Sequence, residues 1–201
     1  MAVLAAGLLT LGIVAGCSSA PAYEAGTRTS SEFTSAWMGL KFTLPDDMVM
    51  VSDEQLEQLM QISADVMYTD SKTGEQMIDY TKLVVVHEMM AQSTSDGSNV
   101  IVMAEKTTGN MTEDKYIETA KKQIQTQLNA EYRVVTEGAT RTLAGQEFKE
   151  LTYAVDASKT LGYSLDQTML VKKKGDRMIV IVFGYGGAEQ LQKLMDGFSA
   201  L

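Results

Sequence analysis

The chain has 201 residues with 17 basic and 26 acidic side chains, which gives a formal net charge of −9 at pH 7. This acidity argues against nucleic acid as a partner, because that affinity comes largely from Lys and Arg neutralising phosphates. It also argues against a domain that lies flat on anionic lipid head groups. The single Cys rules out an intramolecular disulfide, and the single His rules out a metal site built from several His.

The first sixteen residues have the composition of a secretory leader. From Ala2 to Gly16 every residue is Ala, Val, Leu, Gly, Ile or Thr, and the first charged side chain is Glu24. The run is shorter than the roughly 20 apolar residues of a membrane-spanning helix, and it is typical of a signal peptide. It departs from that pattern in one respect, since no Lys or Arg precedes it.

The apolar run ends on Val14, Ala15, Gly16 and Cys17, which resemble the lipobox of bacterial lipoproteins. The resemblance implies that a diacylglyceryl group is attached to the Cys17 thiol and that cleavage removes residues 1–16. The alternative is an ordinary secreted protein with a chance Cys near its cleavage site. A lone thiol is uncommon in an exported protein, and two acyl chains anchor a protein stably. We therefore expect a lipid anchor on Cys17 and a position on the extracytoplasmic face of the cell membrane.

The mature chain divides into two parts by composition. Residues 17–36 are rich in Ser, Ala, Thr and Gly and have no sustained periodicity, which is typical of a flexible tether. Residues 37–201 are enough for one globular domain that buries roughly 70% of its unfolded surface. We expect the lipidated Cys17 and its tether over 17–36 and a single domain over 37–201.

The domain begins with a strand and a helix. Apolar and polar residues alternate over 39–44 and Pro45 stops the pattern, which predicts a strand. Ser52 followed by Gln55 is the pattern of a capping box, and Leu56 lies on the apolar face of the helix that it starts.

A hairpin and a second helix come next. The runs 83–90 and 99–104 are rich in strand-forming residues and are joined by the turn-forming cluster 95–98, which predicts a β-hairpin. Thr112 is placed to cap a helix that continues to about Leu128, with an apolar stripe on one side.

The last third of the chain is a series of strands closed by a helix. The expected strands are 132–136, 141–143, 147–155, 165–172 and 177–183. A final helix from Ala188 places Leu191, Leu194, Met195 and Phe198 on one face, which should dock on the sheet.

This order, with short turns between most strands, predicts an α+β fold with a mostly antiparallel sheet covered by helices, an α/β/α sandwich. The residues from Gly39 to Pro45, the stretch from Leu191 to Phe198 and the elements between them resemble the PsbP-like family. That family includes the extrinsic photosystem protein PsbP and a nuclear-import factor that binds Ran, and the chain is more similar to small lipoproteins with that domain. The resemblance covers nearly the whole mature domain and implies binding to a protein partner without catalysis.

Three motifs approach a catalytic or ligand-binding pattern and depart from it. The stretch Gly162–Asp166 is similar to a nucleophile elbow around Ser164, but Asp166 replaces the final Gly and no His follows the Ser. Residues 184–187 could bind phosphate between a strand and a helix, but they lack the Lys of a P-loop and the spacing of a dinucleotide fingerprint. Residues 70–75 suggest a calcium loop, but Lys72 stands where an oxygen ligand is needed.

The methionines offer one more kind of site. Fourteen Met in the chain is a high number, and thioether ligands suit copper(I). His87, Met89 and Met90 are close in sequence, and strand alternation predicts that His87 and Met89 share one sheet face while Met90 lies on the other. Most of the remaining Met fall at apolar positions where Met fills core space.

We therefore expect a membrane-anchored lipoprotein whose domain is a non-catalytic protein-binding module, without a cofactor, a metal or catalytic residues. A copper(I)-binding lipoprotein is the first alternative. A hydrolase that acts on envelope material is the second, and it would depend on Ser164 or His87.

Overall fold

The computed structural model describes residues 22–58, 84–107, 110–127, 131–157 and 163–201. The described strands form one seven-stranded sheet and one four-stranded sheet. The elements are β1 (Thr27–Arg28), β2 (Glu32–Ser35), β3 (Leu40–Thr43), β4 (Met48–Met50), β5 (Val85–Ser93), β6 (Asn99–Lys106), α3 (Glu113–Gln127), β7 (Glu131–Leu143), β8 (Gln146–Ala157), β9 (Tyr163–Lys174), β10 (Arg177–Tyr185), α5 (Ala188–Asp196) and β11 (Phe198–Ala200).

The large sheet has the order β4-β5-β6-β10-β9-β8-β7 and the small one the order β1-β2-β3-β11. Neighbouring strands in both sheets pair antiparallel. The predicted fold class, α+β with a mostly antiparallel sheet, is confirmed. The small sheet was not predicted.

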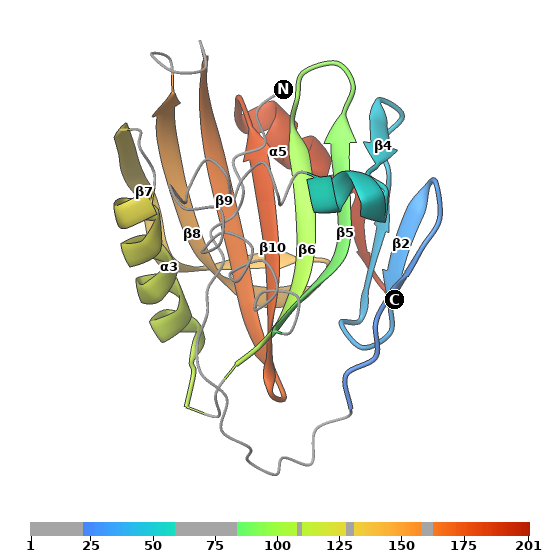
Figure 1. Cartoon of the computed structure of the whole chain (residues 1–201), viewed down its shortest axis with the longest axis horizontal. Helices are drawn as coiled ribbons and strands as arrows, with labels where there is room; N and C mark the ends of the chain where they lie inside the picture. The colour runs from blue at the N-terminus through green and yellow to red at the C-terminus, as the bar shows by residue number, and fades with distance from the viewer. Residues whose placement is uncertain (1–21, 59–83, 108–109, 128–130, 158–162) are drawn as a thin grey trace.

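The two faces of the large sheet are covered differently (Figure 1). On one face α3 and the short helix at residues 53–58 pack through Tyr116, Ile117 and Leu56 against a core that includes Val180. On the other face α5 and the small sheet share a second core, to which Phe33 contributes from β2. The structure is therefore helix on sheet on one side, and helix plus sheet on sheet on the other.

The globular domain begins before residue 37. Phe33 is fully buried, and the Tyr23 hydroxyl donates a hydrogen bond of 2.5 Å to Oε1 of Glu88 in β5. The backbone N–H of Gly26 donates to Oε2 of the same carboxylate at 2.7 Å. The tether prediction for 17–36 is thus wrong from Tyr23 onward, because two aromatic side chains within a Ser- and Thr-rich stretch are enough to fix it to the sheet.

A β-bulge at Glu88 changes which face of the large sheet its neighbours occupy. His87 pairs with Met103 and Met89 pairs with Val102, so Glu88 is an extra residue in β5. As a result Met90 and Met103 lie in the core beneath α3, while Met89 lies in the core shared with α5. The prediction that His87 and Met89 share a face is wrong, because a bulge reverses the alternation of side chains along a strand.

Two further differences concern the ends of elements. The predicted strands 132–136 and 141–143 are parts of the one long strand β7, whose pairing with β8 shifts twice, next to Thr136 and next to Ala139. Phe198, predicted on the last helix, lies in β11 and pairs with Phe42 of β3. The helical spacing extended one turn too far, because α5 ends at Asp196 and Gly197 follows.

The predicted capping box is confirmed. The Ser52 hydroxyl accepts a hydrogen bond from the Gln55 backbone N–H at 3.2 Å, and the Gln55 side chain accepts one from the Ser52 backbone N–H at 3.0 Å. Within the described ranges, no helix is both long and apolar enough to cross a bilayer.

Candidate functional site

The structure separates the two residues on which a Ser hydrolase would depend. Ser164 lies in β9, where its backbone pairs with that of Asp156, and His87 lies in β5. β6 and β10 lie between these strands, which corresponds to roughly 14 Å at about 4.8 Å per strand. A nucleophile elbow also requires a turn between a strand and a helix, whereas Ser164 lies in a paired strand. A Ser164–His87 pair is therefore excluded.

The glycine-rich segment 184–187 is a tight connection between β10 and α5. The Gly186 backbone N–H already donates to Oε1 of Gln190 at 2.7 Å. A Cβ on Gly184 would lie 2.8 Å from Nδ2 of Asn99, so this glycine allows two strand ends to approach closely. The segment connects two elements and does not offer a free phosphate cradle.

Cys17 and the calcium-loop candidate at 70–75 lie outside the described residues. In the part of the chain that the structure describes, no group of three or more His, Cys, Asp or Glu is placed to hold a metal ion.

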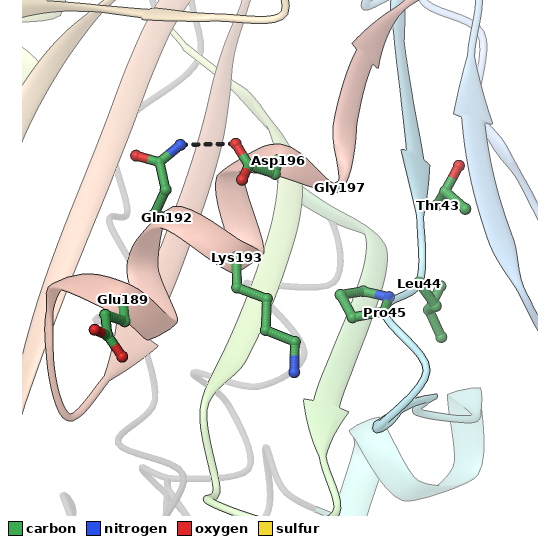
Figure 2. A pocket seen from close by; sticks show the side chains of 8 residues that line it. All are labelled: Thr43, Leu44, Pro45, Glu189, Gln192, Lys193, Asp196 and Gly197. Carbon is green, nitrogen blue, oxygen red and sulfur yellow. Dashed lines mark hydrogen bonds between the residues drawn. The ribbon is translucent and has the colours of Figure 1, made fainter.

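The candidate site is an open groove of about 580 Å³ between α5 and the segment that leaves β3 (Figure 2). Leu44 and Pro45 give one wall an apolar surface, and exposed polar side chains of α5 form the other. The groove is lined by Thr43, Leu44, Pro45, Glu189, Gln192, Lys193, Asp196 and Gly197. Its openness suits a segment of a macromolecule better than a small ligand, because small-ligand sites usually enclose most of the ligand surface.

A close approach at Gly197 fixes the position of α5 beside the groove. The Gly197 carbonyl accepts a hydrogen bond of 2.9 Å from the Thr43 backbone N–H. A Cβ on Gly197 would lie 2.5 Å from Cε2 of the Phe42 ring and 3.0 Å from the Thr43 carbonyl oxygen. Only a residue without a side chain fits here, and Leu194 then packs into the core beneath the helix.

Asp47 ties one end of the groove together. Its carboxylate forms an ion pair with Lys193 of α5 and accepts a hydrogen bond of 3.1 Å from the Ser95 hydroxyl. The hydrogen bond from Lys193 is the main cause of the lowered pKa of Asp47, and the bond from Ser95 adds to it. The sequence indicated only that the chain turns near this residue, and its partners lie too far along the chain to be found by spacing.

A second acidic residue links the same region to the β5–β6 turn. Asp96 accepts hydrogen bonds from the Ser98 hydroxyl at 2.7 Å and from the Gln190 side-chain amide at 2.7 Å. Partial burial raises the pKa of Asp96, but these hydrogen bonds outweigh it and lower the pKa to about 2. Asp96 is therefore charged across the physiological pH range.

The rim of the groove is acidic overall. Glu189 and Asp196 are exposed on α5, and the Asp196 carboxylate accepts a hydrogen bond of 2.7 Å from Gln192 (Figure 2). Among the described residues that line the groove, Lys193 is the only basic one, and Asp47 already pairs with it.

A buried polar network lies beneath the same helix. Arg141 of β7 donates to both carboxylate oxygens of Glu150, at 2.6 and 3.0 Å. The Thr152 hydroxyl also donates to this carboxylate, at 2.7 Å, and lies within hydrogen-bond distance of Thr168. Tyr185, at the end of β10, completes the series with a hydrogen bond of 2.7 Å to Thr168. The network holds four strands in register below α5.

Comparisons with known proteins find distant likenesses in structure alone. No protein-family model and no curated protein sequence matches the chain. The solution structure of cyanobacterial PsbP (CyanoP) from Synechocystis sp. PCC 6803 is similar with a TM-score of 0.48 and 11% identity, over 90% of this chain and 98% of that chain. The crystal structure of LpqN, involved in cell envelope biogenesis of Mycobacterium tuberculosis, is similar with a TM-score of 0.43 and 14% identity, over 80% and 82%. Both likenesses are too distant to carry an argument about activity or partner.

Proposed function

We propose that this protein is a lipoprotein anchored on the extracytoplasmic face of a cell membrane, and that its domain is a non-catalytic module that binds a protein partner through the groove beside α5. The observation that carries the proposal is the open groove with an apolar wall and an acidic rim. The lipid on Cys17 confines the domain to the membrane, and the groove supplies its recognition surface.

The distance between anchor and domain supports this assignment. Among the described residues, Tyr23 is the first whose side chain contacts the large sheet. Six backbone steps separate it from Cys17, and they span at most about 20 Å. Tyr23 stacks against Arg177, the first residue of β10, at 3.9 Å from its ring centre. α5 follows the other end of β10 (Figure 1). A short anchor at one end of the sheet would direct the groove away from the membrane.

The charge of the rim specifies the chemistry of the partner. Glu189 and Asp196 have no basic residue beside them in the groove other than Lys193, which Asp47 engages. The partner segment should therefore carry basic side chains around an apolar residue that packs on Leu44 and Pro45. Complementary charge of this kind increases the association rate and the selectivity more than it increases affinity.

A site-specific photo-crosslinker tests the proposal on intact cells. We place it at Gln192 in the groove and, as a matched control, at Glu118, an exposed position on α3 on the opposite face. One discrete adduct from position 192, absent from position 118 and lost when Leu44→Asp is added, is the expected result. The same adducts from both positions, or no adduct from either, would contradict the groove as the binding surface.

A further inference from the structure

Three basic residues stand side by side at one end of the large sheet, on the face that packs against the small sheet. Arg177, the first residue of β10, pairs with Lys106 at the end of β6 and with Lys174 at the end of β9. Directly opposed residues of paired strands project from the same face, and Ile179, two residues after Arg177, lies in the core of that face. The three cations therefore form a row across three neighbouring strands, and each is partly exposed.

Two aromatic side chains join this row to the first described residues of the chain. The Arg177 guanidinium lies 3.9 Å from the centre of the Tyr23 ring, and Nζ of Lys174 lies 5.5 Å from the centre of the Trp37 ring. The two rings are in edge-to-face contact, with their centres 5.2 Å apart. The described chain thus starts, in blue, toward the same end of the sheet as the turn between β9 and β10 (Figure 1). We call Lys106, Lys174, Arg177, Tyr23 and Trp37 the basic end.

The positive charge of the basic end is not neutralised by ion pairs. Among the described residues, the ion pairs involve none of its three cations, and Nη1 of Arg177 donates to the neutral carbonyl oxygen of Ala104 at 3.4 Å. Two exposed acidic residues, Glu24 and Asp176, are next to the cluster along the chain. The excess charge here is therefore small but positive, in a chain whose net charge is −9.

We propose that the basic end is the surface by which the domain touches the membrane that anchors it, and that its Lys and Arg side chains bind the phosphate groups of anionic phospholipids. Arg binds phosphate through its planar fork and Lys as a compact charge. The position of the anchor selects a bilayer as the occupant, because Cys17 is at most about 20 Å of extended chain from Tyr23. The inference rests on the proposed lipid on Cys17 and adds a fixed orientation of the domain.

A short tether makes this small excess of positive charge effective. An anionic surface would repel the acidic domain if the domain lay flat on it. A lipid on Cys17 keeps the basic end beside the bilayer, so contact becomes an intramolecular event at a high effective concentration. The acidic rim of the groove beside α5, which follows the other end of β10, then faces away from the lipid head groups.

The chain contains a single Trp, which makes the contact measurable. Trp37 belongs to the basic end, so energy transfer from Trp37 to a dansyl-labelled lipid head group reports how close this end is to the bilayer. The acylated mature protein is reconstituted in vesicles of phosphatidylcholine alone and of phosphatidylcholine with phosphatidylglycerol, at low and high salt. Each protein in vesicles without dansyl is the reference, because Lys174 lies over the ring and its replacement changes the Trp37 emission.

Two double variants with the same change in net charge separate the basic end from the rest of the surface. Lys106→Gln with Lys174→Gln removes two cations from the basic end and leaves Arg177 in place. Lys122→Gln with Arg133→Gln removes two cations from exposed positions on α3 and β7 and is the matched control. Thermal melts verify that each variant is folded.

We expect more efficient transfer with the anionic vesicles than with phosphatidylcholine alone. Each Lys removed from the basic end should lower the ratio of docked to undocked protein about fivefold at low salt, and less at high salt. The control variant should behave as the parent does. Equal transfer with both kinds of vesicle, or an equal loss in both double variants, would overturn the inference.

Flotation of the vesicles distinguishes a failure of this inference from a failure of the anchor. Protein that floats with both kinds of vesicle but shows no difference in transfer contradicts the orientation and leaves the anchor on Cys17 standing. Protein that floats with neither kind contradicts the anchor, and the inference that rests on it is overturned as well.

Discussion

A buried glutamate on each face of the large sheet has a shifted pKa, and the two pKa values are shifted in opposite directions. Glu105, beneath α3, and Glu150, beneath α5, are both 3% exposed. Burial raises the pKa of Glu105 to about 7, and the hydrogen bond from Tyr116 offsets only part of this shift. Burial also raises the pKa of Glu150, but the hydrogen bonds from Arg141 and Thr152 outweigh it and lower the pKa overall.

The difference shows that burial alone does not decide the charge of a carboxyl group. Arg141 reaches Glu150 with two N–H groups in a bidentate arrangement, the strongest form of such a pair. Among the described residues, Glu105 has one neutral hydroxyl as its donor, and no basic side chain is a cause of its pKa shift. One face therefore stabilises a charge through a network of hydrogen bonds, and the other holds a carboxyl group whose Oε1 has no hydrogen-bond partner among the described residues.

The largest expected effect on stability comes from weakening the packing of the small sheet on the face of the large sheet that holds Glu150. Phe33→Ala deletes a fully buried ring that lies in the core shared by β2, β3 and α5. We expect a loss of about 3–5 kcal/mol in the free energy of unfolding, as is usual for buried Phe. Urea denaturation monitored by circular dichroism measures it. A loss below about 1 kcal/mol would show that residues 23–36 are not part of the cooperative domain.

The next largest effect is expected when Glu150 loses its basic partner, so that it is buried without a cation as Glu105 is. Arg141→Met keeps much of the side-chain volume but leaves the Glu150 carboxylate buried without its cation. We expect a loss of about 3 kcal/mol, at the lower end for broken buried pairs because Arg141 is partly exposed. Adding Glu150→Gln should recover most of the loss, and full additivity of the two changes would contradict the coupling.

The third effect is a pH dependence that belongs to Glu105. Its pKa in the folded protein is above the usual carboxyl value of 4.5, so the folded state binds more protons than the unfolded state between about pH 4.5 and 7. The contribution of this group to stability is therefore complete below about pH 4.5 and is lost as the pH rises to about 7.

Glu105→Gln should remove the loss of stability that occurs as the pH rises to about 7. We expect the variant to be more stable than the parent by about 2 kcal/mol at pH 8 and to differ less at pH 5, in denaturation curves measured at both values. Glu150→Gln is the control for the opposite face, because a lowered pKa makes the stability contribution of Glu150 disappear as the pH falls. The same pH profile in both variants would contradict the comparison.

The smallest effect concerns Tyr116, which donates a hydrogen bond to Glu105. Tyr116→Phe removes the hydroxyl that donates to Oε2 and leaves the ring in the core, so we expect a loss of about 1 kcal/mol at pH 8. The loss should be smaller at pH 5, where the carboxyl group is neutral. Thermal melts at both values measure it, and a larger loss at pH 5 would contradict the assigned charge states.

The local signals in the sequence predicted most elements of the fold. The capping box at Ser52, the hairpin around 95–98 and the amphipathic α5 depend on residues close in the chain. The first two appear as predicted, and α5 forms but ends one turn earlier than predicted. β2 was missed because its single aromatic residue, Phe33, stands in a stretch rich in Ser and Thr. The bulge at Glu88 left no trace in composition, since one extra residue in a strand does not change the residue types around it.

The candidate sites depend on contacts between distant parts of the chain, which explains why the sequence did not reveal them. Asp47 and Lys193 meet across the groove although 146 positions separate them. The position of His87 opposite Met103 could be found only after the bulge had fixed the faces of β5. Sequence alone predicted α5 and the strand that Pro45 ends, but not that the two lie on either side of the groove.

The central claim, that an acylated N-terminus holds this domain at a membrane, is tested most directly by the intact mass of the protein isolated from its native membrane. The account predicts that the polypeptide begins at Cys17 and carries the added mass of a diacylglyceryl group. It also predicts that Cys17→Ser moves the protein from the detergent phase to the aqueous phase. An unmodified thiol in an aqueous protein, or a native chain that retains residues 1–16, would contradict it.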